Sequence, residues 1–175
     1  REELQAAFDQ LKASVSISGG ATGAGAGILT TRENLVAVLE LTEEIFKRPI
    51  FDSEELEVLK EQMIVGLEQE KQQPTSRVFR ELGNHLNPYS PGHPFYQISI
   101  DDEIAQIRSI TSEDLQVFHT RFIGGQDAEA SVVGDFDIEE INAQLNTIMT
   151  DWRSEANYQR IKSQVADVDS INRFI

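Results

Sequence analysis

The stretch that decides the fold is FDSEELEVLKEQMIVGLEQEKQQP, residues 51–74. Asp52 offers a side-chain oxygen three residues before Glu55, which is typical of a helix amino terminus, and Pro74 closes the pattern. Gly66 lies well inside this helix, where glycine costs about 1 kcal/mol relative to alanine, so its presence needs an explanation. The stretch predicts one long helix with a packed apolar stripe formed by Leu56, Leu59, Met63 and Leu67.

Three further helix starts carry similar punctuation. Thr30-Thr31-Arg32-Glu33 has the form of a capping box, and Thr111 with Asp114 and Asp137 with Glu140 repeat its logic. We therefore predict helices that begin near residues 31, 112 and 138. Their apolar faces are expected at Leu35, Val38, Leu39, Thr42, Ile45 and Phe46; at Leu115, Phe118 and Phe122; and at Ile138, Ile141, Leu145, Ile148 and Met149.

Strand signals are fewer. Residues 14–18 alternate in polarity, and residues 25–30 follow a glycine-rich turn, so the two runs predict a hairpin. Residues 130–134 form a short β-prone run. Residues 84–93 predict a loop, because the stretch NPYSPGHP at residues 87–94 carries three prolines. These elements predict an α+β fold, with a two-layer antiparallel or mixed sheet and helices packed on one face.

The domain boundaries follow from the ends of these patterns. We expect one α/β domain over residues 1–153, followed over residues 154–175 by a linker and the start of another domain. The chain opens on a helix already under way, REELQAAFDQLKAS, so we expect an interior slice of a longer protein whose amino-terminal strands are missing.

Composition excludes several classes of function. Apolar residues make up 39% and charged residues 26% of the 175, an ordinary globular composition. The net charge of −15 repels phosphate backbones, so nucleic acid is not an expected partner. No apolar run approaches membrane-spanning length, and the absence of cysteine rules out disulfides, thiolate metal sites and a cysteine nucleophile.

No pattern of catalytic residues stands out. The glycine run at residues 19–27 lacks the Lys-Ser/Thr of a phosphate-binding loop and enters a strand, so a flexible hairpin is the better interpretation. His85, His93 and His119 have no metal-ligand spacing, and neither HExxH, HxxEH nor GxSxG occurs in the chain. Paired carboxylates such as Asp101-Asp102 lie at helix starts, where the helix dipole favours them.

The order of the motifs resembles one family, the pitrilysin/insulinase zinc metallopeptidases, including the processing-peptidase type. The segment REELQAAFDQLKASVSIS resembles the helix and strand that follow the metal motif of that family. TTRENLVAVLELTEEIFKRPIFDSEELEVLKEQ resembles its block of two helices separated by a proline. HPFYQ, ITSEDLQVFHTRF, ASVVGDFDIEEI and SINRFI then resemble a loop, the close of the domain and entry into the next one.

The resemblance implies two homologous halves around a chamber. One half holds zinc through two histidines of HxxEH and a glutamate on a later helix, and the Glu inside the motif is the general base. Over residues 51–74, Gly66 falls on the position of the ligand Glu and Leu59 on a second acidic position. A slip in register would instead bring Glu68 or Glu61 to those positions. The resemblance thus implies no catalytic residue and no metal ligand in this chain, with zinc in the active half of the parent protein.

We therefore predict a non-catalytic domain of an insulinase-type zinc metallopeptidase that contributes to a peptide-binding chamber. Two alternatives stay open: the catalytic zinc-binding domain with HxxEH upstream, and a structural or assembly subunit without peptidase activity. Expected partners are other domains of the parent chain or a homologous subunit, and a peptide substrate whose contact residues are unknown. A periplasmic and a cytoplasmic location are both compatible with the sequence.

Overall fold

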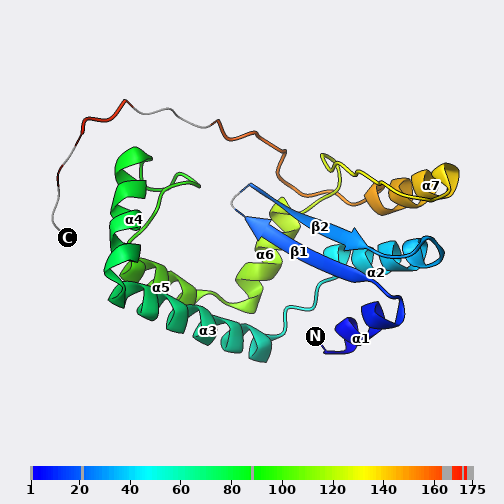
Figure 1. Cartoon of the computed structure of the whole chain (residues 1–175), viewed down its shortest axis with the longest axis horizontal. Helices are drawn as coiled ribbons and strands as arrows, with labels where there is room; N and C mark the ends of the chain where they lie inside the picture. The colour runs from blue at the N-terminus through cyan, green and yellow to red at the C-terminus, as the bar shows by residue number, and fades with distance from the viewer. Residues whose placement is uncertain (1, 21, 88, 163–166, 171, 173–175) are drawn as a thin grey trace. The chain divides into compact units, whose positions relative to one another are not determined.

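The computed structural model describes residues 2–20, 22–87, 89–162, 167–170 and 172. Within these residues the elements are α1 (Glu2–Gln10), β1 (Ser14–Gly20), β2 (Gly23–Leu29), the 3-10 helix η1 (Arg32–Asn34), α2 (Leu35–Lys47), α3 (Ser53–Gln72), α4 (Pro74–Leu86), α5 (Ile100–Ser109), α6 (Ser112–Phe122) and α7 (Ile138–Met149) (Figure 1). The predicted α+β class is confirmed.

The chain forms two compact units. Unit 1 comprises Arg1–Ile50 and Gln116–Gln159, and unit 2 comprises Phe51–Leu115 and Arg160–Ile175. Unit 1 therefore holds the hairpin with α1, α2 and α7, whereas unit 2 holds α3, α4 and α5.

The hairpin and two helices build the core of unit 1. β1 pairs with β2 antiparallel, in a register that places Val15 opposite Ile28. These two residues pack against a buried cluster of Phe8 from α1, Ala13 and Val38 from α2. Of these, Val38 has no exposed surface. The unit is thus a helix layer on one face of a two-stranded sheet, with its hydrocarbon between the layers.

The predicted helix faces are confirmed in part. In α2, Val38, Leu39 and Thr42 are buried as expected. In α7, Ile141 is buried but Ile138, in the first turn, is exposed. In α6, Phe118 and Phe122 are also exposed, and their rings lie 5.1 Å apart, centroid to centroid.

The helix caps predicted from the sequence are confirmed at three of the four predicted helix starts. At the start of α3, Asp52 accepts from the backbone N–H groups of Glu54 and Glu55. At the start of α7, Asp137 accepts from those of Glu139 and Glu140. Thr111 and Asp114 form a complete reciprocal box at α6. The box predicted at Thr30 is wrong, because the Thr30 hydroxyl donates to the Leu11 carbonyl instead. A 3-10 turn then delays α2 until Leu35.

The strand predicted at residues 130–134 is wrong. These residues belong to no strand, and the sheet of the described residues consists of β1 and β2 alone. A β-prone run needs a neighbouring backbone to form a ladder, and propensity alone does not supply one. Gly134, with φ of +145°, then redirects the chain toward the start of α7.

One helix of unit 2, α4, was not foreseen, and α5 was expected only as a helix start at Asp101-Asp102. Pro74 lies just after α3 and is also the first residue of α4. Proline is tolerated at this position because the first N–H groups of a helix have no partner within the helix. α4 runs to Leu86, so the predicted loop begins at residue 87 rather than 84. Ser99 caps α5 by accepting from the Asp102 N–H, which is again a capping-box spacing.

Candidate functional site on α3

The position of α3 in unit 2 is set by one side of the helix. Leu56, Ile64 and Leu67 are half-buried there, and Lys60 is buried between them. The Lys60 ammonium donates to the Glu57 carboxylate at 2.7 Å and to the Ile110 carbonyl at 3.0 Å. The second of these bonds satisfies a carbonyl at the carboxyl end of α5, so Lys60 ties the two helices together.

The predicted packing stripe on α3 is therefore wrong in two of its four members. Leu59 is 51% and Met63 48% exposed, whereas Leu56 and Leu67 are half-buried. The true buried side is shifted around the helix, because Lys60 uses its long aliphatic stem to reach a carbonyl. A charged residue in the middle of the packed side is what the apolar periodicity failed to anticipate.

Leu59, Met63 and Gly66 form an open surface, which we call the α3 apolar face. Their spacing of four and three residues places them on one side of a helix. A Cβ atom built at Gly66 would have no heavy atom within 4 Å, so glycine is not required there by packing against any described residue. The face therefore offers hydrocarbon and bare backbone.

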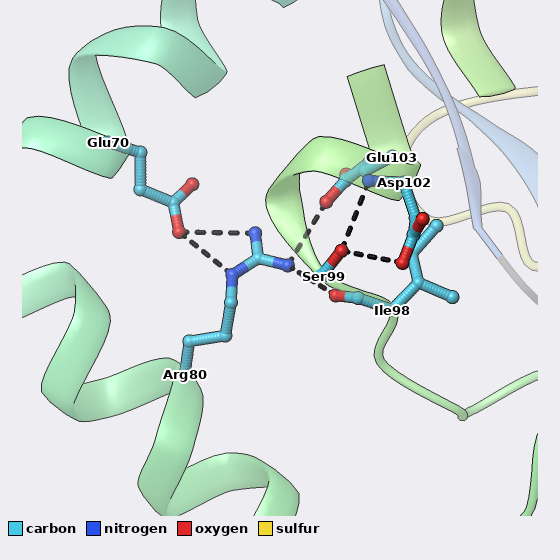
Figure 2. Close-up of polar contacts among 6 residues, drawn as sticks. All are labelled: Glu70, Arg80, Ile98, Ser99, Asp102 and Glu103. Atoms are coloured by element: carbon cyan, nitrogen blue, oxygen red, sulfur yellow. Dashed lines mark hydrogen bonds and ion pairs between the residues drawn. The ribbon is translucent and has the colours of Figure 1, made fainter. Parts of the chain in front are cut away.

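The nearest carboxylate further along this face belongs to Glu70, and it is already engaged. Figure 2 shows it beside Arg80 of α4, whose guanidinium reaches three parts of unit 2. Arg80 Nε and Nη2 donate to Glu70 Oε1 at 3.3 and 3.2 Å. Arg80 Nη1 donates to the Ile98 carbonyl and to Glu103 Oε2, each at 3.1 Å.

This arrangement, the Arg80 clamp, is a structural tie. The Arg80 side chain is only 14% exposed, and Glu70 and Glu103 come from α3 and α5. A planar guanidinium that satisfies two carboxylates and a carbonyl joins three elements at once. Lys71 adds a second tie between α3 and α5 through Asp101 at 2.5 Å; this hydrogen bond is the main reason why the pKa of Lys71 is raised.

The three histidines are engaged in separate places. His85 Nε2 lies 2.8 Å from the Asp169 carbonyl, and His119 Nε2 lies 2.6 Å from the Phe46 carbonyl. His93 accepts from the Phe95 N–H through Nδ1 at 3.1 Å and stacks on Tyr89 with a centroid distance of 4.3 Å. Across the described part of the chain no cluster of three His, Cys, Asp or Glu side chains is arranged to hold a metal ion.

The glycine run at residues 19–27 forms the end of the hairpin. β1 and β2 pair as far as Gly20 with Gly23, and most of this ribbon is exposed. The run therefore enters a second strand, as the sequence predicts, and does not open a helix as a phosphate-binding loop does. Across the part of the chain that the structure describes, none of the helices combines the length and apolar character that a membrane crossing requires.

The chain is similar to known proteins in part of its sequence and in its fold. Residues 109–172 match the family model described as the peptidase M16 inactive domain. The fold matches the crystal structure of a peptidase M16 inactive domain from Pseudomonas fluorescens, with a TM-score of 0.70 and 21% sequence identity. No curated protein matches the chain.

Both matches point to the same kind of domain. Part of this chain is thus similar to the peptidase M16 inactive domain, in line with the resemblance drawn from the sequence, and the structural match confirms the fold. The alignment covers 95% of this chain but 39% of the Pseudomonas fluorescens chain, so this chain spans well under half of that protein's length.

Proposed function

We propose that this domain, of the M16 inactive type, contributes a metal-free wall to a peptide-binding chamber and that zinc is held by another part of the parent protein. The observation that carries the proposal is the α3 apolar face. Leu59 and Met63 remain about half exposed, and space lies open above Gly66. In the resemblance drawn from the sequence, a catalytic relative carries acidic residues at the positions of Leu59 and Gly66.

This face suits an extended peptide better than a cation. Thioether and hydrocarbon side chains are poor ligands for zinc, which binds His, Cys and carboxylate groups in proteins. They favour apolar side chains of a peptide, and a glycine lets the peptide backbone come close to the helix. The partners of this domain would then be the other domains of the parent protein and the peptide held between them.

Charge adds a preference among peptides. The net charge of −15 attracts basic peptides over acidic ones and speeds their encounter with the domain. This attraction weakens as ionic strength rises, because the Debye length falls to about 8 Å at physiological salt. A basic peptide is therefore the probe of choice.

Site-specific photocrosslinking tests the proposal. A photoreactive amino acid replaces Met63 on the α3 apolar face, or Glu61 as a matched control on another side of the helix. The full chain is illuminated with a basic, unstructured peptide that contains apolar residues. We expect peptide adducts at position 63 and few at position 61. Equal labelling at both positions, or no labelling at 63, would overturn the proposal.

A further inference from the structure

The chain between α4 and α5 is folded around one histidine, and we call residues 89–97 the His93 loop. The His93 backbone N–H donates to the Ser90 carbonyl at 3.1 Å, and the His93 carbonyl accepts from the Tyr96 N–H at 2.8 Å. The first of these bonds closes a turn that contains Gly92, whose φ of +89° is the left-handed conformation that such a turn requires. Two successive turns therefore meet at His93.

The His93 side chain makes a third hydrogen bond inside the same loop. Its Nδ1 accepts from the Phe95 backbone N–H at 3.1 Å. The ring stacks on Tyr89, with 4.3 Å between the centroids and 8° between the planes, and its centroid lies 5.6 Å from that of Phe95. All three side chains are half-buried. The loop thus uses His93 as a hydrogen-bond acceptor within a small aromatic cluster.

Beyond His93 the loop is held on α4. Arg80 donates to the carbonyl of Ile98, the residue directly after the loop. A Cβ atom built at Gly83 of α4 would lie 3.2 Å from Gln97 Oε1, so the Gln97 side chain lies against the helix there. Neither contact involves His93. A change in the charge of His93 therefore acts on the middle of the loop and leaves its end on α4.

The hydrogen bond at Nδ1 requires a neutral imidazole. Nδ1 can accept only while Nε2 carries the single ring proton, because both ring nitrogens of an imidazolium are donors. A proton on Nδ1 would bring two N–H groups together where His93 and Phe95 now share one. The described side chains in ring contact with His93 are those of Tyr89 and Phe95, and neither carries a charge between pH 5 and 8. Neither side chain compensates for the lost bond.

We propose that the His93 loop is an acid-sensitive device, closed while His93 is neutral and opened when its imidazole takes up a proton. Imidazole is the side chain that ordinarily changes charge between pH 5 and 8. Proton binding and loop closure compete for the same nitrogen, so the closed loop is most stable above this range and loses stability as pH falls through it. Opening releases the rings of Tyr89 and Phe95, so mild acid adds aromatic surface to unit 2.

NMR spectroscopy of the full chain tests the device without any substitution. The chemical shift of the His93 Cε1–H reports protonation of the ring. The protection factor of the Phe95 amide against hydrogen exchange, which divides out the intrinsic effect of pH, reports the hydrogen bond. We expect this factor to fall about tenfold from pH 8 to pH 5, as for the loss of one hydrogen bond, with the midpoint of the His93 titration. A constant factor, a ring that stays neutral, or two different midpoints would overturn the proposal.

Two substitutions separate the ring of His93 from its hydrogen bond. His93→Asn keeps an acceptor at the δ position and does not titrate, whereas His93→Phe keeps an aromatic ring without an acceptor. We expect the Asn variant to protect the Phe95 amide equally at pH 8 and pH 5, and the Phe variant to protect it at neither.

His85→Asn is the matched control, because it removes another histidine of unit 2. It should leave the pH response of the Phe95 amide as in the native chain. A response that persists in His93→Asn would overturn the proposal, since another group would then drive the opening. Protection lost in His93→Asn at pH 8, or kept in His93→Phe, would contradict the role given to the Nδ1 hydrogen bond.

Discussion

The two units are stabilised by different means. In unit 1, side chains from α1, α2 and the hairpin meet in a buried hydrocarbon cluster around Val38. In unit 2, α5 buries Ile100, Ile104 and Ile107, but α3 contributes the buried Lys60 and α4 contributes the Arg80 clamp. One unit thus relies on an apolar core, and the other joins its helices through charged groups.

The difference accounts for the exposed apolar residues of α3 and α4, whereas the exposed Phe118 and Phe122 of α6 lie in unit 1. α3 directs Lys60 inward between half-buried leucines, and α4 directs Arg80 inward. Other apolar residues of these two helices, such as Leu59, Met63 and Phe79, are left exposed. The α3 apolar face and the exposed apolar residues of α4, which are Val78, Phe79, Leu82 and Leu86, both belong to unit 2. A helix whose charged side chains form internal ion pairs leaves apolar side chains exposed, where peptides or other domains can bind.

The largest effect is expected in the core of unit 1. Phe8→Ala removes a ring that is 5% exposed, and a cavity in a packed core costs about 3–5 kcal/mol. Urea denaturation of the variant measures the loss. Val133→Ala, at a 95% exposed position of the same unit, is the control and should change stability by less than about 0.5 kcal/mol. Similar losses in both variants would show that Phe8 is not a core residue.

A smaller loss is expected from the Arg80 clamp. Arg80→Ala leaves Glu70 and Glu103 without their shared partner and should cost about 2 kcal/mol, since hydrogen bonds to charged groups contribute about 1.5–3 kcal/mol each before solvent screening. Arg80→Lys keeps the charge but loses the planar fork, so it should recover only part of the stability. Arg77→Ala, on an exposed neighbour, is the control. An unchanged free energy of unfolding in Arg80→Ala would contradict the view that charged groups join the helices of unit 2.

The helix caps should act alike in both units. Asp52→Ala at α3 and Asp137→Ala at α7 each remove an oxygen that accepts two backbone N–H groups. Each change should cost about 1 kcal/mol, whatever the chemistry of the core behind the helix. Asn at either position keeps an acceptor and should restore most of the loss. A cost found in one unit only would mean that capping depends on the packing of that unit.

The smallest effect is a pH dependence at the start of α6. The Thr111 hydroxyl, and then the Thr111 backbone N–H, hold the pKa of Asp114 below its ordinary value of 3.8. A carboxyl with a lowered folded-state pKa stabilises the fold above the unfolded value, and this stability is lost as pH falls through the folded value. Thr111→Ala should therefore flatten the acid side of the stability profile. An unchanged slope between pH 5 and the acid transition would contradict this assignment.

Local signals carried most of the prediction from sequence. The caps at Asp52, Thr111 and Asp137 are set by neighbours within three residues, so the sequence alone was enough to place them. The hairpin followed from alternation around a glycine-rich turn. A helix start was expected at Asp101-Asp102, and the bounds of α5 could have been found as well, because Ser99 and Asp102 carry the capping spacing that was recognised elsewhere.

The errors came from contacts between segments distant in sequence. Leu59 and Met63 were predicted to be core residues. They are exposed because the buried side of α3 is the side from which Lys60 donates to the Ile110 carbonyl, 50 residues away. Residues 130–134 have strand composition, but no backbone among the described residues pairs with them. The Thr30 hydroxyl donates to the Leu11 carbonyl and does not cap the helix that follows it. No local pattern contains these partners.

Zinc analysis of the purified chain tests the central claim most directly, namely that α3 presents a surface without metal ligands. The chain is equilibrated with zinc, separated from free metal by gel filtration and analysed for metal by mass spectrometry. We predict no stoichiometric zinc. Equimolar zinc that disappears in Glu68→Gln or Glu61→Gln would contradict the account, because it would show that α3 does supply a carboxylate to a metal ion.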